Sequence, residues 1–111
     1  MKSKPIPLSF SERVVRLARS VPVGRVTTYG RISRAAGGGG MAAQSITTIL
    51  GKAWDAGVKD IPFHRIVYAD GKIWVDEHHR AERMKLYKKE GIAIDKRDRV
   101  VDFRDKLLEF S

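Results

Sequence analysis

Few side chains in this sequence could carry out covalent chemistry. The 111 residues include no cysteine, so the chain has no thiolate nucleophile, no disulfide and no thiolate metal ligand. The run Asp76-Glu77-His78-His79 offers carboxylate and imidazole groups, but adjacent histidines on a helix point about 100° apart and seldom share one ion. We therefore expect an acidic helix N-terminus there, with no metal site and no cofactor. Ser45 offers a hydroxyl, and nothing in the sequence activates it.

Basic residues are concentrated in the first half of the chain, although the whole carries a formal net charge of +9. The first 55 residues hold nine Lys or Arg and two acids, a net of +7, whereas residues 56–111 hold thirteen and eleven, a net of +2. A polyanion is the natural complement, because each neutralised phosphate releases a condensed counterion. Nucleic acid fits best, with acidic lipid or simple solubility as alternatives. The cations with few acidic neighbours in the sequence are Arg13, Arg16, Arg19, Arg25, Arg31, Arg34 and Lys52.

The length allows one domain, over residues 1–111. No apolar run approaches the roughly 20 residues that a membrane span needs, and the first residues lack the apolar core of a signal peptide. We therefore expect a soluble, cytoplasmic protein.

The elements that must position any site are mostly helical. Helical spacing of apolar residues predicts three helices in the first half, over about residues 9–21, 28–36 and 41–53. The capping box Ser9-Phe10-Ser11-Glu12 begins the first helix, and Thr27 or Thr28 caps the second. The third has a face of short polar side chains, which predicts a helix-turn-helix, with an ordinary helical pair as the alternative. The glycines at 37–40 fit a turn better than a phosphate loop, because no Gly-Lys-Ser/Thr follows.

The second half predicts a small wing. Asp70-Gly71 lies between the β-prone runs 65–68 and 72–75, which indicates a β-hairpin. A fourth helix is expected from near Asp76 to Gly91, and residues 103–110 suggest a short docking helix. The predicted fold is mainly α with a small β-hairpin, a winged helix-turn-helix-like domain.

Three segments resemble one known family, in the same order along the chain. Ile61-Pro62-Phe63-His64-Arg65-Ile66-Val67 resembles the active-site signature of the O6-alkylguanine-DNA alkyltransferases, Pro-Cys-His-Arg-Val. The run 22–30 resembles the segment before that family's helix-turn-helix, and 89–92 its late glutamate–glycine element. The resemblance spans roughly residues 10–94 and implies a domain of the alkyltransferase C-terminal type. Because Phe63 stands where the alkyl-accepting cysteine would be, the chain resembles the alkyltransferase-like proteins, which bind alkylated guanine without repairing it.

The resemblance implies that the ring of Phe63 lines a pocket for the lesion. His64 and Glu90 match the family's proton relay, which has no task without a thiol. We expect them to form a hydrogen-bonded scaffold for the pocket, together with Arg65, which could instead face DNA. Trp54 lies in a segment that departs from the family pattern and is expected in the core, with the pocket as the alternative.

The resemblance also implies a DNA-facing set. Tyr29 matches the tyrosine that promotes rotation of the target nucleotide out of the duplex. Gln44 stands where the family has an arginine that occupies the space left in the base stack by the flipped base. We therefore expect weaker base flipping, or Arg34 as a substitute for that arginine. Ile66 matches an apolar pocket wall, while Trp74 either faces the pocket or packs the wing. The residues expected to bind DNA or the lesion are Tyr29, Arg34, Gln44, Ser45, Thr48, Pro62, Phe63, Ile66 and Trp74.

The implied function is non-enzymatic. The protein would recognise O6-alkylguanine in double-stranded DNA by base flipping and flag it for nucleotide excision repair proteins. We expect a monomer associated with the nucleoid and no membrane partner. The alternative is a sequence-specific winged helix-turn-helix transcriptional regulator, which would usually dimerise.

Overall fold

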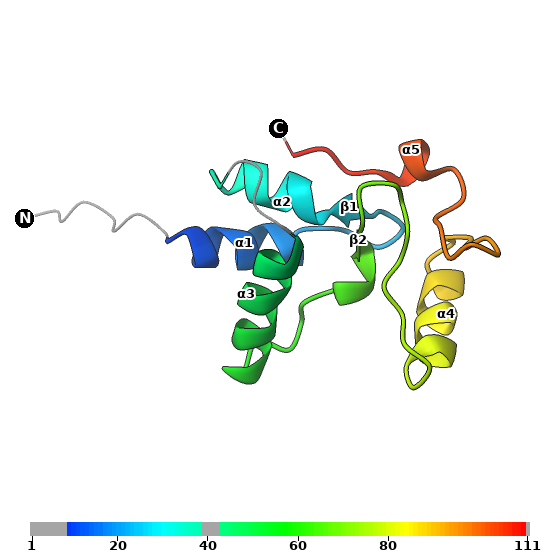
Figure 1. Ribbon diagram of the computed structural model, residues 1–111, viewed down its shortest axis with the longest axis horizontal. Helices are drawn as coiled ribbons and strands as arrows, with labels where there is room; N and C mark the ends of the chain where they lie inside the picture. The colour runs from blue at the N-terminus through cyan, green and yellow to red at the C-terminus, as the bar shows by residue number, and fades with distance from the viewer. Residues whose placement is uncertain (1–8, 39–42, 111) are drawn as a thin grey trace, which may run out of the picture.

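The computed structural model describes residues 9–38 and 43–110, which form helices on either side of a two-stranded sheet (Figure 1). In chain order the elements are α1 (Phe10–Arg19), β1 (Thr27–Thr28), α2 (Tyr29–Ala35), α3 (Ala43–Asp55), the 3₁₀ turn η1 (Phe63–Arg65), β2 (Ile66–Val67), α4 (Arg80–Lys89) and α5 (Phe103–Lys106). The expected start of the third helix near residue 41 lies outside the described residues. None of the described helices is long and apolar enough to cross a membrane.

The first three helices form as their local signals predict. The Ser9 hydroxyl accepts a hydrogen bond from the Glu12 N–H, and the Glu12 carboxylate accepts one from the Ser9 N–H, which completes the capping box of α1. Thr28 caps α2 by accepting from the Arg31 N–H at 3.2 Å. The three helices pack around a first core cluster, composed of Val14, Ala18, Ile32, Ala36, Ile46, Leu50, Ile61 and Ile66.

The two strands join this helical half to the rest of the chain. β1 pairs with β2 in parallel, with Thr27 opposite Ile66 and Thr28 opposite Val67. Successive side chains of a strand point to opposite faces, so Ile66 enters the first core cluster and Val67 enters a second one. The second cluster contains Val26, Val67, Ile73, Tyr87, Ile92 and Val100.

The predicted β-hairpin is wrong in its strand pairing, although the turn is present. The Gly71 N–H donates to the Tyr68 carbonyl and the Tyr68 N–H donates to the Lys72 carbonyl, both at 2.9 Å. The first arm pairs with β1, however, and Lys72 in the second arm forms an antiparallel bridge with Arg99. Each arm has a backbone partner from elsewhere in the chain, so the small sheet is parallel and not a wing hairpin.

The helix α4 starts four residues later than expected. The Asp76 carboxylate accepts from the His79 N–H and contacts the His79 ring, which makes residues 76–79 a turn ahead of the helix. At the other end, Gly91 has a positive φ of 76°, and the Ile92 N–H donates to the Tyr87 carbonyl. This is a Schellman ending, and it places Glu90 at the C-cap of α4.

The C-terminal segment is only partly helical. α5 ends at Lys106, and the chain then runs beside Val26 in an extended conformation. The Val26 N–H donates to the Lys106 carbonyl and the Leu108 N–H donates to the Val26 carbonyl, so the tail adds a third backbone segment next to β1.

Candidate functional site

A cavity of about 440 Å³ lies where the two halves of the chain meet. Its walls come from the first turns of α2 and α3, from η1, from the chain after β2 and from α4. Aromatic rings dominate the lining, which suits stacking on a planar base. We call it the aromatic cavity, and its lining residues are Tyr29, Gln44, Thr47, Phe63, Tyr68, Trp74 and Arg83.

Phe63 is held in this wall by its backbone. Pro62 precedes η1, and the Arg65 N–H donates to the Pro62 carbonyl at 2.9 Å, which closes a tight turn. The turn leaves the Phe63 ring half-buried, with its edge against Trp54 at 5.6 Å between ring centroids. The residue at the expected acceptor position therefore lies in the wall of the aromatic cavity.

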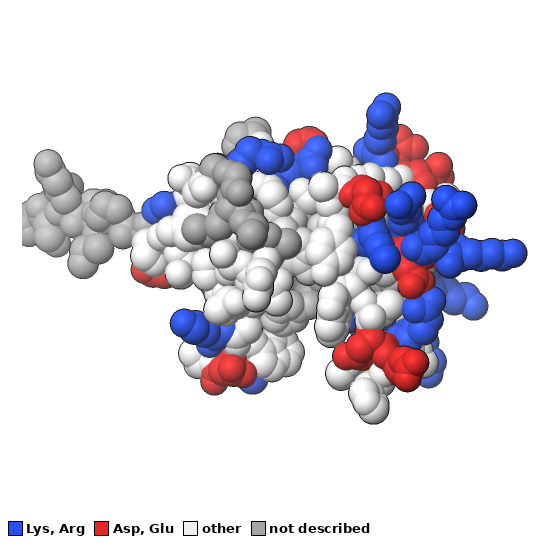
Figure 2. Space-filling view, in the orientation of Figure 1, with Lys and Arg blue, Asp and Glu red and all other residues white. Residues whose placement is uncertain are grey.

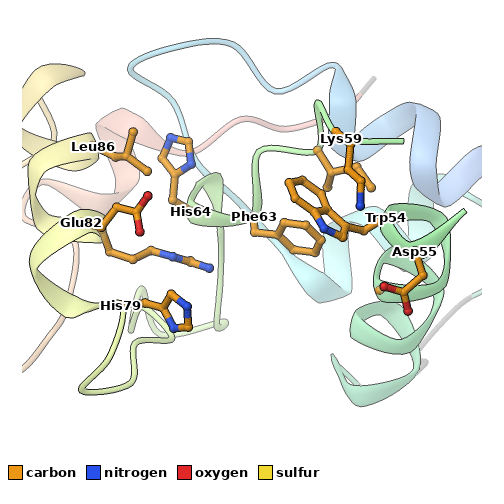
Figure 3. Close-up of a pocket in the computed structure, with 11 residues that line it drawn as sticks. Trp54, Asp55, Lys59, Phe63, His64, His79, Glu82 and Leu86 are labelled. Atoms are coloured by element: carbon orange, nitrogen blue, oxygen red, sulfur yellow. The ribbon is translucent and has the colours of Figure 1, made fainter. Parts of the chain in front are cut away.

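Phe63 also borders a second cleft, of about 480 Å³ (Figure 3). Figure 3 shows the Phe63 ring between His64 and the indole of Trp54. Trp54 is 37% exposed, and the Lys59 ammonium lies 4.7 Å from its ring centroid. The expectation that Trp54 is a core residue is therefore wrong, because its exposed ring lines this cleft beside Phe63.

Tyr29 and Tyr68 form one end of the aromatic cavity. Their ring centroids are 5.5 Å apart and the rings are tilted by 46°. Burial and the neighbouring Tyr68 raise the pKa of Tyr29, so its hydroxyl stays protonated at neutral pH and can donate a hydrogen bond. Tyr29 is hydrogen-bonded to Thr47 of α3, which ties the starts of α2 and α3 together at this point.

Trp74 and Arg83 form the opposite end. Trp74 faces the cavity and is 46% exposed, which resolves its two expected placements in favour of the cavity. The Arg83 guanidinium lies 5.7 Å from the Trp74 ring centroid, a distance suitable for a cation–π contact. This end therefore presents a positive charge beside an exposed aromatic face.

Behind Phe63, His64, Arg65 and Glu90 form a hydrogen-bonded cluster. Arg65 donates to both carboxylate oxygens of Glu90 at 2.9 Å, and His64 Nε2 lies 2.6 Å from Glu90 Oε2. Arg65 also donates to the Val21 carbonyl at 3.0 Å, which links the cluster to the end of α1. The side chain of Glu90 is 7% exposed, and every polar contact it makes is to a donor. Arg65 is thus directed into the cluster.

The charges in this cluster follow from its hydrogen bonds. Burial alone would raise the pKa of Glu90, but the hydrogen bonds from Arg65 and His64 outweigh it and lower the pKa to about 2. Burial lowers the pKa of His64 more than the Glu90 contact raises it. The imidazole is therefore neutral at pH 7, with Nε2–H donating to the carboxylate. Such a pair can accept a proton from a neighbouring acid, and Phe63 supplies none.

Several of the expected residues do not line the aromatic cavity. Ile66 is 2% exposed and lies in the first core cluster, and Pro62 is buried next to η1. The Thr48 hydroxyl donates to the Gln44 carbonyl, and its side chain faces α1. Arg34 lines a separate depression beside the C-terminal tail, so it is not placed to assist Gln44. Ser45 is half-buried on α3 next to Gln44.

Three cavity residues were absent from the expected set: Thr47, Tyr68 and Arg83. Thr47 lies on the polar face already seen in the third helix. Arg83 could have been found from helical spacing. It precedes the buried Tyr87 by four residues and Glu90 by seven, so all three lie on the same face of the helix. Tyr68 carries no such signal, since its position depends on β2 pairing with β1.

The sequence predicted that the cations of the first half have few acidic partners, and for some of these cations the prediction is wrong. Arg19 pairs with Asp60 and Arg31 pairs with Glu109, each at 2.8 Å, so acids of the second half neutralise them. Arg25 donates to a backbone carbonyl of the C-terminal tail. On the face seen in Figure 2, blue and red side chains mix over α4 and α5, whereas the surface over α3 is mostly uncharged.

Comparisons with known proteins give the same fold. A family model described as 6-O-methylguanine DNA methyltransferase, DNA binding domain, matches residues 9–92. S. pombe Atl1, solved in complex with damaged DNA containing O6-carboxymethylguanine, superposes with a TM-score of 0.70 at 19% identity, covering 91% of this chain and 95% of that one. S. pombe ATL in complex with DNA gives a TM-score of 0.68 at 20% identity, with the same coverage.

A variant of the M. tuberculosis O6-methylguanine methyltransferase gives a TM-score of 0.56 at 24% identity, covering 77% of this chain and 50% of that one. A comparison with curated protein sequences gave no match. The predicted fold class is confirmed by these structural similarities, and the hairpin is the part of it that needed correction.

Proposed function

The chain belongs to the family described as 6-O-methylguanine DNA methyltransferase, DNA binding domain, and from this premise we propose that it binds O6-alkylguanine in duplex DNA without removing the alkyl group. The family match covers both the helix-turn-helix and the segment around Phe63. The fold is shared with proteins that were solved on DNA, one of them on DNA containing an O6-alkylated guanine.

The observation that carries the proposal is Phe63 in the wall of the aromatic cavity. Direct dealkylation needs a nucleophile that attacks the alkyl carbon and keeps the alkyl group. A phenyl ring has no lone pair for this attack, and no cysteine exists elsewhere in the chain. The ring supplies apolar surface, which suits contact with an alkyl substituent.

In the proposed complex the third helix lies in the minor groove and the damaged guanine rotates into the aromatic cavity. Tyr29 lies at the start of α2 and would crowd the phosphate next to the target nucleotide. Gln44 would reach into the vacated stack and hydrogen-bond the unpaired cytosine. The cluster of His64, Arg65 and Glu90 would hold η1, and therefore Phe63, against the flipped base.

The proposed partners follow from this mode of binding. A protein that holds a lesion and cannot repair it must pass the site to another system, for which we propose nucleotide excision repair proteins. It would act as a monomer on chromosomal DNA in the cytoplasm.

A direct test compares two duplexes that differ only in one guanine or O6-methylguanine. Fluorescence anisotropy should show tighter binding of the modified duplex by at least about tenfold, which corresponds to about 1.4 kcal/mol. Equal affinities would exclude lesion recognition. Binding that depends on the surrounding sequence and ignores the lesion would instead support a transcriptional regulator.

A second test follows the alkyl group itself. Incubation of the protein with duplex carrying O6-methylguanine, followed by mass spectrometry of protein and DNA, should leave both masses unchanged. Any methylated protein, or any loss of O6-methylguanine, would contradict the non-enzymatic assignment.

A further inference from the structure

A groove of about 580 Å³ runs between α1 and α3, away from the aromatic cavity. Gln44 and Thr47 of α3 face the aromatic cavity, whereas Thr48 and Lys52 face this groove. We call it the α1–α3 groove, and its lining residues are Ser11, Glu12, Val15, Arg16, Arg19, Thr48, Ile49, Lys52, Ala53 and Val58. The two surfaces share none of these residues.

The floor of the α1–α3 groove is apolar. Val15, Ile49, Ala53 and Val58 are all half-buried, and all pack against the first core cluster. Their inner sides are fixed by that packing, so their outer sides form a concave apolar strip that remains open to solvent. Such a strip is suited to receive apolar side chains of another molecule.

The rim of the groove is basic. Arg16 and Lys52 are exposed and have no hydrogen bond or ion pair with any of the described residues. Arg19 is paired with Asp60, and the one acid on the rim, Glu12, already accepts the capping hydrogen bond of α1. Two cations that have no partner within residues 9–38 and 43–110 therefore lie on the two helices that border the apolar strip.

We propose that the α1–α3 groove is a docking site for an acidic amphipathic helix of a partner protein. The apolar face of that helix would lie on the strip, and its flanking carboxylates would meet Arg16 and Lys52. From Ser11 to Arg19 the groove follows α1 for about 12 Å, so two to three helical turns would fill it.

Charge and shape favour this occupant over others. A nucleic-acid backbone would contact the rim but leave the apolar strip uncovered. A second copy of the chain would bring a further net charge of +9 to a surface that is already basic. The proposal does not depend on lesion recognition, because the groove and the aromatic cavity share no lining residue.

The test uses the full chain and three synthetic helical peptides of about 14 residues, long enough to form a few turns. The first carries Leu at i, i+4 and i+7 with Glu on both sides of the apolar stripe. The second has Lys in place of each Glu, and the third has Ala in place of each Leu. In NMR titrations of methyl-labelled protein, only the first should saturably shift the Val15, Ile49 and Val58 methyl signals.

Variants then locate the contact. Arg16→Glu combined with Lys52→Glu should weaken binding of the first peptide by about tenfold or more, because two attractions become repulsions. The matched control is Lys96→Glu with Arg104→Glu, which makes the same change of net charge at exposed residues remote from the groove, and it should bind as the wild type does.

Three results would overturn the proposal. One is equal binding of the Glu and Lys peptides, and another is no shift with any peptide. The third is a shift of the same methyl signals by undamaged duplex DNA that the first peptide cannot displace, which would assign the groove to nucleic acid.

Discussion

At the scale of single residues, the site places the phenyl ring of Phe63 in front of a complete hydrogen-bonded cluster. The cluster of His64, Arg65 and Glu90 keeps the hydrogen bonds that a buried carboxylate requires, although Phe63 gives it no proton to accept. Its place between α1, η1 and α4 gives it a structural task that does not depend on proton transfer. The cavity in front of it is lined by aromatic rings, which are suited to stacking on a planar base.

Gln44→Arg should strengthen binding of duplex DNA containing O6-methylguanine by about tenfold. A guanidinium can stack in the space that a flipped base leaves, and such stacking is worth about 1–3 kcal/mol. Anisotropy with the modified duplex measures the change. Thr48→Arg is the matched control: it adds the same charge one turn later on α3 but faces α1, so an equal gain would show that charge alone was responsible.

Glu90→Gln should destabilise the protein by roughly 3 kcal/mol at neutral pH, and the loss should shrink in acid. The folded-state pKa of Glu90 is lowered to about 2 from 4.5, so its contribution is fully present above about pH 4.5 and disappears as the pH falls through 2. Urea unfolding of both proteins between about pH 7 and pH 3 measures the effect.

The lowered pKa of His64 also makes the folded protein less stable in acid. The neutral ring is favoured by the folded state, so acid should begin to destabilise the wild type below about pH 6.5. A difference between wild type and Glu90→Gln that stayed constant with pH would show that Glu90 is not charged in the folded state.

At the scale of elements, short segments aim the site residues. The Schellman ending of α4 sets Glu90 at a helix end, where its side chain reaches both His64 and Arg65. The parallel pairing of β1 with β2 brings Tyr29, which follows β1, next to Tyr68, which follows β2. One pair of two-residue strands therefore positions one end of the aromatic cavity.

Gly71→Ala should destabilise the fold more than Gly91→Ala. Both glycines have positive φ, 85° and 76°, so either alanine costs about 1 kcal/mol of backbone strain. A Cβ at 71 would also lie 3.0 Å from Cγ of Phe103, whereas a Cβ at 91 meets nothing within 4 Å. The midpoints of urea unfolding measure the loss of stability in each variant. Equal losses would mean that Phe103 and α5 move away from the added methyl group at no cost in free energy.

At the scale of the whole molecule, the fold decides which of the positive charges behind the net charge of +9 are neutralised by acidic neighbours. The division of the sequence into a basic and a mixed half does not decide this. Ion pairs such as Arg19–Asp60 and Arg31–Glu109 join residues far apart in the chain and remove cations from the set available to DNA. Exposed cations such as Arg16 and Lys52, which have no partner among the described residues, should supply affinity for any duplex, and the aromatic cavity should supply the preference for damage.

Salt should therefore weaken binding without changing that preference. Between about 50 and about 200 mM salt, affinity for plain and O6-methylguanine duplexes should fall by the same factor, because both lose the same phosphate contacts. Anisotropy at several salt concentrations gives the two slopes. A preference that disappeared at high salt would mean that lesion recognition is electrostatic and not a property of the cavity.

The sequence by itself determined the features that depend on hydrogen bonds between near neighbours. The capping box of α1 and the helix end at Gly91 each close within about five residues, so residue types alone predict them. For α2 the residue types narrowed the cap to Thr27 or Thr28, and the structure shows that it is Thr28. The segment around Phe63 can likewise be recognised from the sequence, because the residues that resemble the family's signature, 61–67, are consecutive. These signals predicted the helices and the fold class, which the structure confirms, and they marked Phe63 as the residue on which the proposed function rests.

The tertiary structure alone decided which distant segments meet. β-prone runs on either side of Gly71 predicted a hairpin, but strand pairing depends on the backbone partners that become available when the whole chain closes. The same closure brought Tyr68 and Arg83 into the aromatic cavity and left Thr48 facing α1. It also paired Arg31 with Glu109, because charge compensation depends on distance in space and not on separation along the chain.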